Sequence, residues 1–159
     1  MSVHEPTSYK TKRDTARGII LHNGSVLLIK RSRLGLNYYS TPGGGIEPGE
    51  TPFEAVKREL HEETSLELNV EREIYQWHEG PHIHYFFYCT YVSGVPHLQE
   101  DAEENQNGPD NTHTPIWIDA NEIIMCNFGY WEPLKNILAN DIKNGLPEIS
   151  KIITTSAVV

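Results

Sequence analysis

The sequence predicts a single domain of the α/β (α+β) class, and three local patterns carry that prediction. Two apolar runs at residues 18–22 and 25–30 flank an Asn-Gly pair at residues 23–24, which is the strongest short-range signal for a β-hairpin. A run rich in aromatic residues at 83–92 is typical of a further strand. Between them, Thr51 opens a segment with the signals of a helix start. Strands on both sides of a helix in one short chain favour one mixed domain.

Chain length and hydropathy narrow the class further. The chain has 159 residues and a mass of 18.1 kDa, which is enough for one core and too little for two. We therefore expect one domain over residues 1–159, with its core at about residues 14–145. No apolar run reaches the ~18–20 residues that span a bilayer, and residues 1–6 are polar. These features predict a cytoplasmic protein without a membrane partner. Cys89 and Cys126 are expected to be reduced thiols.

The charge balance excludes one class of partner. The chain carries 13 Lys and Arg against 22 Asp and Glu, a formal net charge of −9. This balance argues against a partner held through a polyphosphate backbone, such as duplex DNA. A small phosphate ligand remains compatible, because carboxylates can first bind a divalent cation. Glutamates, with no aspartate among them, are concentrated between Glu47 and Glu73. A solvated acidic helix is the ordinary interpretation of such a run.

The central helix has well-defined start signals. Thr51 is a good N-cap, Pro52 suits the first helical position, and Glu54 completes a capping box. We expect the helix to continue to about residue 64. Its core-facing stripe is expected to consist of Phe53, Val56 and Leu60.

The remaining elements follow in order. A glycine-rich loop is expected at residues 43–45, and a long polar loop at 99–113. Strands are expected at residues 66–77, 83–92 and 115–118. A second capping box, Asp119 with Glu122, predicts a helix towards Ile123, and a last helix is expected at about residues 131–142.

Spacing within the central helix points to a metal site. Glu59, Glu62 and Glu63 lie at i, i+3 and i+4, so their side chains share an arc of ~100° on one face. Like charges at this spacing repel each other, which makes the arrangement unfavourable for a helix that only needs to be soluble. The arrangement is reasonable if a hard divalent cation lies between the carboxylates, because Mg²⁺ takes carboxylate, water and phosphate oxygens.

A longer pattern joins the glycine loop to this helix. From Gly44 the chain reads glycine, five residues, Glu50, seven residues, and then Arg-Glu-Leu-His-Glu-Glu-Thr-Ser-Leu at residues 58–66. This pattern resembles the Nudix box, and every defined position agrees except the last glycine, which is Ser65 here. The box covers residues 44–66. A looser resemblance extends over most of the chain.

The resemblance implies a fold and an activity. The Nudix fold is a mixed β-sheet sandwiched between helices, and its members typically cleave a nucleoside diphosphate linked to another group. The metal ligands implied by the matching positions are Gly44 (backbone carbonyl), Glu59, Glu62 and Glu63. Glu50 and Arg58 match the pair that braces the box, and the resemblance leaves Glu62 and Glu63 as alternatives for the base. We therefore expect an Mg²⁺-dependent pyrophosphohydrolase, with Mn²⁺ as an alternative ion.

Several alternatives stay open. The substrate can be a nucleoside triphosphate, ADP-ribose, a dinucleoside polyphosphate or a nucleotide sugar. The rival functions are a nucleotide-binding module without hydrolysis and an isomerase on the same fold. Ser65 bears on the first rival, because a left-handed serine at the helix end costs roughly 1 kcal/mol of strain. A homodimer is also open.

Five side chains outside the box are candidates for substrate binding, and each also has a purely structural interpretation. Arg31 and Arg33 can neutralise phosphate or cap a solvated strand end. Tyr39, next to Tyr38, can stack on a base or pack against the box. His84 belongs to a strand face that can line a groove or face solvent, and a role for the nearby histidines in binding metal has little support from their spacing. The acidic loop offers Glu103 among several carboxylates.

Overall fold

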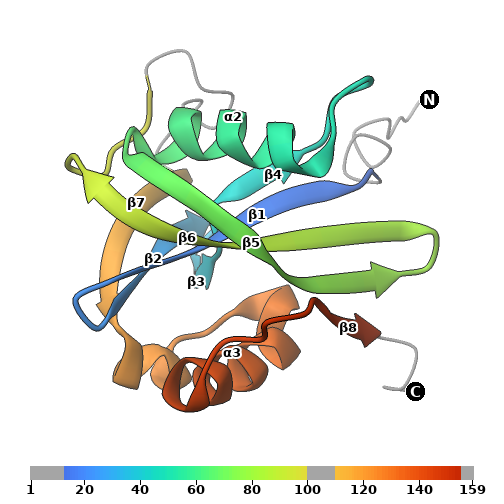
Figure 1. Cartoon of the computed structure of the whole chain (residues 1–159). Helices are drawn as coiled ribbons and strands as arrows, with labels where there is room; N and C mark the ends of the chain where they lie inside the picture. Colours follow the sequence, from blue (N-terminus) through green and yellow to red (C-terminus); the bar gives the residue numbers. More distant parts are fainter. Residues whose placement is uncertain (1–12, 100–109, 155–159) are drawn as a thin grey trace, which may run out of the picture.

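The hairpin predicted around residues 23–24 begins a mixed sheet that a computed structural model describes over residues 13–99 and 110–154 (Figure 1). Within those residues the strands are β1 (Thr15–His22), β2 (Ser25–Arg33), β3 (Leu36–Ser40), β4 (Gly43–Gly45), β5 (Glu67–Glu79), β6 (His82–Ser93), β7 (Asn111–Asp119) and β8 (Lys151–Thr154). The helices there are α2 (Pro52–Thr64) and α3 (Glu132–Asn144), with the 3₁₀ helices η1 (Ala120–Met125) and η2 (Gly129–Trp131).

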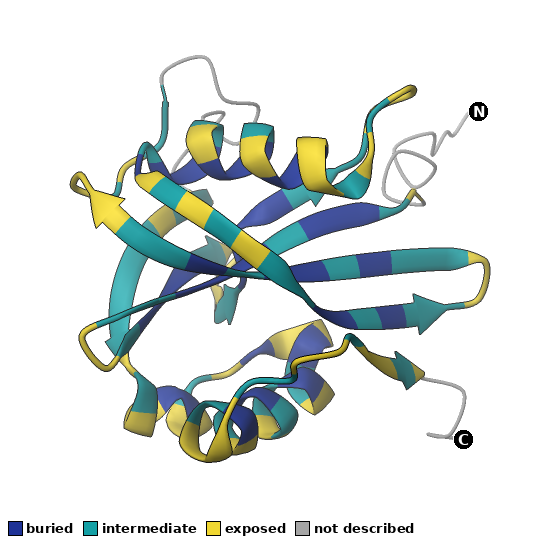
Figure 2. Ribbon diagram, in the orientation of Figure 1, coloured by how far each residue is buried: buried dark blue, intermediate teal, exposed yellow. Residues whose placement is uncertain are grey.

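The two α-helices cover opposite faces of the sheet (Figure 1). On one face, α2 packs against alternate residues of β1 and β2, and this core includes Ala16, Ile20 and Leu27. On the other face, α3 packs against a second core that includes Ile19 and Trp131. Figure 2 shows the same division, with the inner side of α2 buried and its outer side exposed. The expected sheet between helices is therefore confirmed.

Strand pairing opens the sheet on one side of β1. The sheet order is β3-β2-β1-β6-β5-β8, with parallel pairs at β1–β6 and β5–β8. β1 pairs with β2 only beside the hairpin turn, at Leu21–Val26 and His22–Ser25. Further along, β1 pairs instead with β4 across residues 15–17, while β2 continues between β3 and β7. The separation of β1 from β2 leaves room for side chains from both strands.

The start of α2 agrees with its sequence signals, and one buried position does not. The Thr51 hydroxyl accepts from the Glu54 backbone N–H at 3.1 Å, and the Glu54 carboxylate accepts from the Thr51 N–H at 3.0 Å. Val56 and Leu60 are buried as expected. Phe53 is 45% exposed, so its assignment to the core stripe is wrong. Its ring instead lies at the margin of the sheet, 6.2 Å from the ring of Phe87.

Other elements differ from expectation for local reasons. β3 and β8 are short strands without clear sequence signals, and the glycine loop at residues 43–45 is strand β4, because its backbone pairs with β1. The expected helix after Asp119 is a 3₁₀ helix, in which the Asp119 carboxylate accepts from Asn121 N–H instead of forming a capping box with Glu122. β7 already begins within the expected polar loop, most of which lies outside the described residues.

None of the helices that the structure describes is long and apolar enough to cross a membrane. Cys89 and Cys126 are free thiols, and Cys89 is buried. Burial raises the pKa of Cys89 to about 12, so this thiol stays protonated at neutral pH.

Candidate active site

The three glutamates of α2 lie on the side of the helix that meets β4. Glu59 and Glu63 are buried, whereas the Glu62 side chain is 35% exposed. The Gly43 backbone N–H donates to Glu63 Oε1 at 2.7 Å. This bond ties the end of the helix to the start of the glycine strand. Buried carboxylates are costly unless charges or hydrogen bonds compensate them, so their presence here calls for a cation.

Arg58 supplies part of that compensation. Its guanidinium donates to both carboxylate oxygens of Glu50, from Nε at 2.7 Å and from Nη2 at 2.9 Å. Nη2 also donates to the Gly45 carbonyl at 3.0 Å. Nη1 lies 3.3 Å from Glu59 Oε1 and 3.5 Å from Glu62 Oε1. One arginine therefore braces the loop before α2 and faces two of the three glutamates.

The brace shifts the acid–base behaviour of its members. The hydrogen bond from Arg58 lowers the pKa of Glu50 to about 2. The same bond raises the pKa of Arg58 above its already high ordinary value. Both groups are therefore charged across the physiological pH range, and the brace stays intact there.

The donor set suits a hard divalent cation. Gly44 lies so close to Glu59 that an added Cβ would overlap the carboxylate, so any other residue here would displace a proposed metal ligand. No three Asp, Glu, His or Cys side chains in the described part of the chain converge into a preformed metal cage. Mg²⁺ does not need one, because it is usually held by one or two carboxylates, waters and substrate phosphates. Gly44 and the three glutamates fit that requirement.

A cavity of about 320 Å³ adjoins the glutamates, where β1 and β2 separate. Glu63 and the backbone of Gly43 and Gly44 form one side of it. The other walls carry cationic, imidazole and aromatic groups, from Arg17, Arg31, His113, Tyr38, Tyr130 and Trp131. Arginines beside aromatic rings suit a ligand that carries both phosphate and a planar ring.

The charge state of the cavity is set by its two arginines and a neutral histidine. Burial, aided by Arg31 and Arg33, lowers the pKa of His113 to about 4. At neutral pH, His113 therefore adds no positive charge. The Arg31 guanidinium donates to Asn111 Oδ1 at 3.0 Å and lies 5.5 Å from the ring centroid of Tyr38. Arg17 and Arg31 are thus the cationic groups that line the cavity.

The family model for the NUDIX domain matches residues 12–140. The chain belongs to the NUDIX family. Among curated proteins, the RNA pyrophosphohydrolase of Psychrobacter cryohalolentis is 47% identical over 49 residues, which are 31% of this chain and 28% of that protein. This NUDIX chain thus matches less than a third of the length of that relative.

Solved structures show the same NUDIX fold over most of the chain. An ADP-ribose pyrophosphatase from Streptococcus suis superposes with a TM-score of 0.60 at 14% identity, covering 91% of this chain and 99% of that one. A NUDIX hydrolase from Nitrosomonas europaea gives a TM-score of 0.65 at 16% identity, covering 90% and 79%. Identities this low support the shared fold and leave the substrate open.

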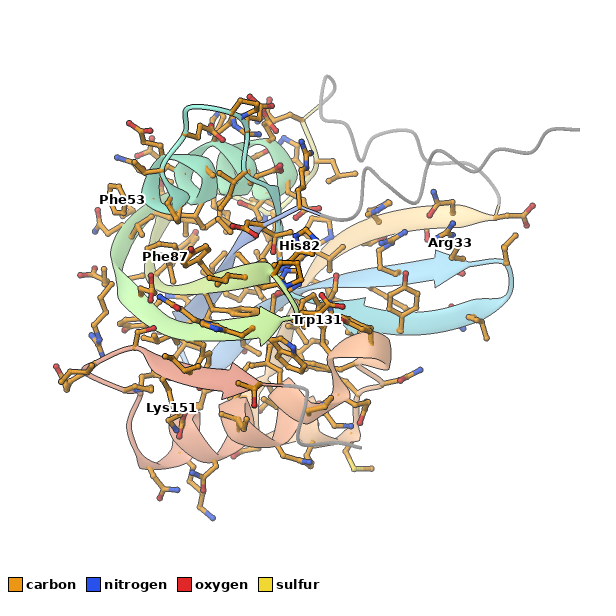
Figure 3. All side chains as sticks on the ribbon, turned by 90° about the vertical axis from the view of Figure 1, so that its right-hand side faces the viewer. Arg33, Phe53, His82, Phe87, Trp131 and Lys151 are labelled. Carbon is orange, nitrogen blue, oxygen red and sulfur yellow. The ribbon has the colours of Figure 1, made fainter. Side chains whose placement is uncertain are left out.

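The five substrate-binding candidates from the sequence fall in different places. Arg31 lines the cavity, whereas Tyr39 of β3 packs against the core on the α3 face of the sheet, and its backbone N–H donates to the Asn127 carbonyl at 2.7 Å. His84 is buried behind the cavity wall. Arg33 is exposed towards the end of the arm formed by β2, β3 and β7, away from Trp131 (Figure 3). Glu103 lies outside the described residues.

Sequence reasoning missed several groups that line the cavity. Arg17, His113, Tyr130 and Trp131 come from three separate segments, and no motif connects them. One signal was available for Arg17: a charged residue among the apolar residues of β1, at 15–21, stands out. Such a residue is either paired or faces a site. The other three needed the tertiary structure.

Proposed function

We propose that this protein is a Mg²⁺-dependent pyrophosphohydrolase that cleaves the diphosphate linkage of a nucleoside diphosphate derivative. The observation that carries the proposal is the position of Glu59, Glu62 and Glu63 beside Gly44, at one end of a cavity with two arginines and three aromatic rings. The names of the relatives, RNA pyrophosphohydrolase and ADP-ribose pyrophosphatase, both denote hydrolysis of a diphosphate bond and support the same reaction class.

We assign each residue of the site a role from its position. Glu59, Glu62, Glu63 and the Gly44 carbonyl hold the ion, and Mn²⁺ can replace Mg²⁺. In that position a divalent cation would supply Lewis-acid polarisation of the diphosphate oxygens and would lower the pKa of the attacking water. Glu62 or Glu63 accepts the proton of that water. Arg58 and Glu50 keep the glycine strand and the helix in place. We further propose that the protein is cytoplasmic and acts on small nucleotides.

A comparison of two glutamate variants tests the metal site. Glu62→Gln removes a ligand charge and is expected to lower turnover by at least a hundredfold. Glu67→Gln, an exposed glutamate at the start of β5, is the matched control and is expected to keep full turnover. Phosphate release is measured over a panel of nucleoside triphosphates, ADP-ribose, dinucleoside polyphosphates and nucleotide sugars, with Mg²⁺ and with Mn²⁺. Full activity of Glu62→Gln would contradict the proposed site.

A further inference from the structure

A chain of hydrogen bonds runs behind the cavity wall from Arg17 to Tyr130. Arg17 Nε donates to Thr15 Oγ1 at 3.2 Å, and Thr15 Oγ1 lies 2.7 Å from His84 Nδ1. His84 Nε2 lies 2.8 Å from Glu79 Oε1, and the Tyr130 hydroxyl donates to Glu79 Oε2. Both terminal residues line the cavity. The chain therefore begins and ends at the same site while its middle is covered.

Only one arrangement of protons satisfies all of these bonds with a neutral imidazole. An ionised Glu79 can only accept, so His84 Nε2 carries the proton that it donates. Nδ1 is then the acceptor, and the Thr15 hydroxyl donates to it while accepting from Arg17. Burial lowers the pKa of His84 and outweighs the opposite effect of Glu79, which favours this neutral form. The charged groups facing the imidazole are Glu79, Arg17 and Asp14.

Two further contacts fix the Arg17 guanidinium. Nη1 donates to the Thr41 carbonyl at 3.1 Å, and the guanidinium carbon lies 5.1 Å from the ring centroid of Trp131. Trp131 in turn packs edge-on against His84, with ring centroids 4.9 Å apart. The guanidinium is therefore oriented before any ligand arrives, and a preoriented arginine loses less conformational freedom on binding.

We propose that Arg17 binds a phosphate oxygen of the substrate and that Thr15, His84 and Glu79 are positioning residues that hold its guanidinium. Arginine suits this task because its planar donors match phosphate geometry. The inference rests on the proposed function, since it takes the cavity as the place where the nucleotide lies. It adds a contact outside the box, from β1, where Arg17 pairs with Gly43 of β4.

A binding measurement without metal tests the role of Arg17. Inorganic pyrophosphate and ADP are titrated calorimetrically in EDTA, so that the ion does not contribute. Arg17→Ala is expected to weaken both ligands by about tenfold or more, because a charge-assisted hydrogen bond is lost. The matched control is Arg72→Ala. Arg72 also donates through Nε, to the Pro147 carbonyl at 2.9 Å, and lies 5.3 Å from the Tyr88 ring, but it does not line the cavity.

Each outcome of this titration is decisive. Weaker binding of both ligands by Arg17→Ala, with unchanged binding by Arg72→Ala, supports the inference. Loss of pyrophosphate binding alone, with ADP unaffected, overturns it, because the arginine would then select free phosphate and not the nucleotide. Absence of pyrophosphate binding by the unmodified protein also overturns it.

A double-mutant cycle tests the positioning residues. His84→Gln alone is expected to weaken pyrophosphate binding about three- to tenfold. In the Arg17→Ala background the same change is expected to have no further effect, because its target is gone. Independent, additive losses would contradict the positioning role. If His84→Gln lowers the folded population in circular dichroism, Glu79→Gln takes its place. The Glu79 side chain is 42% exposed, and glutamine keeps its shape while changing the direction of the hydrogen bonds.

Hydrolysis assays separate this inference from the proposed function. If the unmodified protein hydrolyses a nucleotide and Arg17→Ala still binds both ligands normally, the inference is overturned and the proposed function stands. If binding depends on Arg17 but no nucleotide in the panel is turned over, the inference stands and the proposed function is contradicted. With an identified substrate, Arg17→Lys is expected to restore part of the loss in KM, because lysine keeps the charge but not the planar donors.

Discussion

Arg58 and Arg17 are held in opposite ways, although both lie beside the glycine strand β4. Arg58 is held by carboxylates and a carbonyl from residues 45–62, all within a short stretch of chain. Arg17 is held by a hydroxyl, a carbonyl and an aromatic face, and the partner behind that hydroxyl, His84, is 69 residues from Thr15. The first arrangement consumes the charge of the arginine in ion pairs. The second holds the guanidinium through two hydrogen bonds to uncharged oxygens and one aromatic face, which fixes its orientation.

We expect the alanine variants of the two arginines to differ most in their free energy of unfolding. Arg58→Ala removes the cation that bonds Glu50 and faces Glu59, and it is expected to lower the free energy of unfolding by about 2–3 kcal/mol, with at least a hundredfold loss of turnover. Arg17→Ala is expected to cost less, because losing its hydrogen bonds to the Thr15 hydroxyl and the Thr41 carbonyl leaves no buried charge behind. Chemical denaturation of both variants measures the contrast. Equal losses of stability would contradict the comparison.

The stabilisation by divalent cations should be the next largest difference. It should depend on the glutamates of α2 and not on Arg17. An ion that binds only the folded state adds about 2.7 kcal/mol at a hundredfold excess over Kd. We therefore expect Mg²⁺ or Mn²⁺ to raise the melting temperature of the unmodified protein and of Arg17→Ala by a similar amount. Glu59→Gln should abolish most of the increase, because it removes a proposed ligand. A full increase in Glu59→Gln would count against the metal site, and its loss in Arg17→Ala would show that the regions are not independent.

As the pH falls, the loss of stability that comes from His84, behind Arg17, should begin before the loss that comes from Glu50, beside Arg58. The lowered pKa of His84 means that the unfolded chain binds a proton more readily than the folded one, so stability is lost as pH falls below 6.5. The pKa of Glu50 is lowered from 4.5 to about 2, so its stabilising effect persists until pH falls below 4.5. His84→Gln is expected to reduce the pH dependence of the melting temperature just below 6.5, and the part that remains is expected from His113, whose pKa is also lowered, to about 4. Glu50→Gln should flatten it only below 4.5, and identical profiles would contradict both assignments.

The smallest expected effect concerns the one position that departs from the box. Ser65 has a φ of 62°, so the anticipated left-handed conformation is present. Its hydroxyl donates to the His97 carbonyl at 2.7 Å and accepts from Gln99 Nε2 at 2.8 Å. Glycine would relieve about 1 kcal/mol of strain, but it would lose these bonds and gain freedom in the unfolded chain.

Ser65→Gly is therefore expected to lower stability by about 1 kcal/mol and leave turnover within twofold. The sequence alone favoured a neutral or stabilising change, because the hydroxyl partners were not visible. Thermal melting and phosphate release measure the two effects. A strong gain of activity would instead favour a binding module in which serine blocks hydrolysis.

The two arginines also show which parts of the site can be predicted from the sequence. The face of glutamates on α2 depends only on helical spacing, and the brace of Arg58 and Glu50 belongs to a compact motif. Both were predictable, because their partners are near in the chain. The Thr15–His84 contact was not, since it depends on the parallel register of β1 with β6. No local pattern encodes such a register.

Errors in the fold prediction have a similar origin. Phe53 is exposed although it lies at helical spacing from Val56, and its ring contacts the sheet only edge-on, at Phe87. The three glycines of β4 look like a loop until β1 is placed beside them. In both cases the neighbouring element, and not the residue's own propensity, determines the outcome.

The parallel pairing of β1 with β6 also orders events during synthesis. Residues 45–62, which carry the Arg58 brace, leave the ribosome before the part of β6 that pairs with residues 15–21. Until His84 has emerged, the far edge of β1 has no partner strand and Arg17 has no completed support. Such long-range pairing slows folding, because a large loop must close before the contact forms. The Arg58 brace beside the α2 glutamates can thus form early in synthesis. The support of Arg17 by His84 can form only after more than half of the domain has been made.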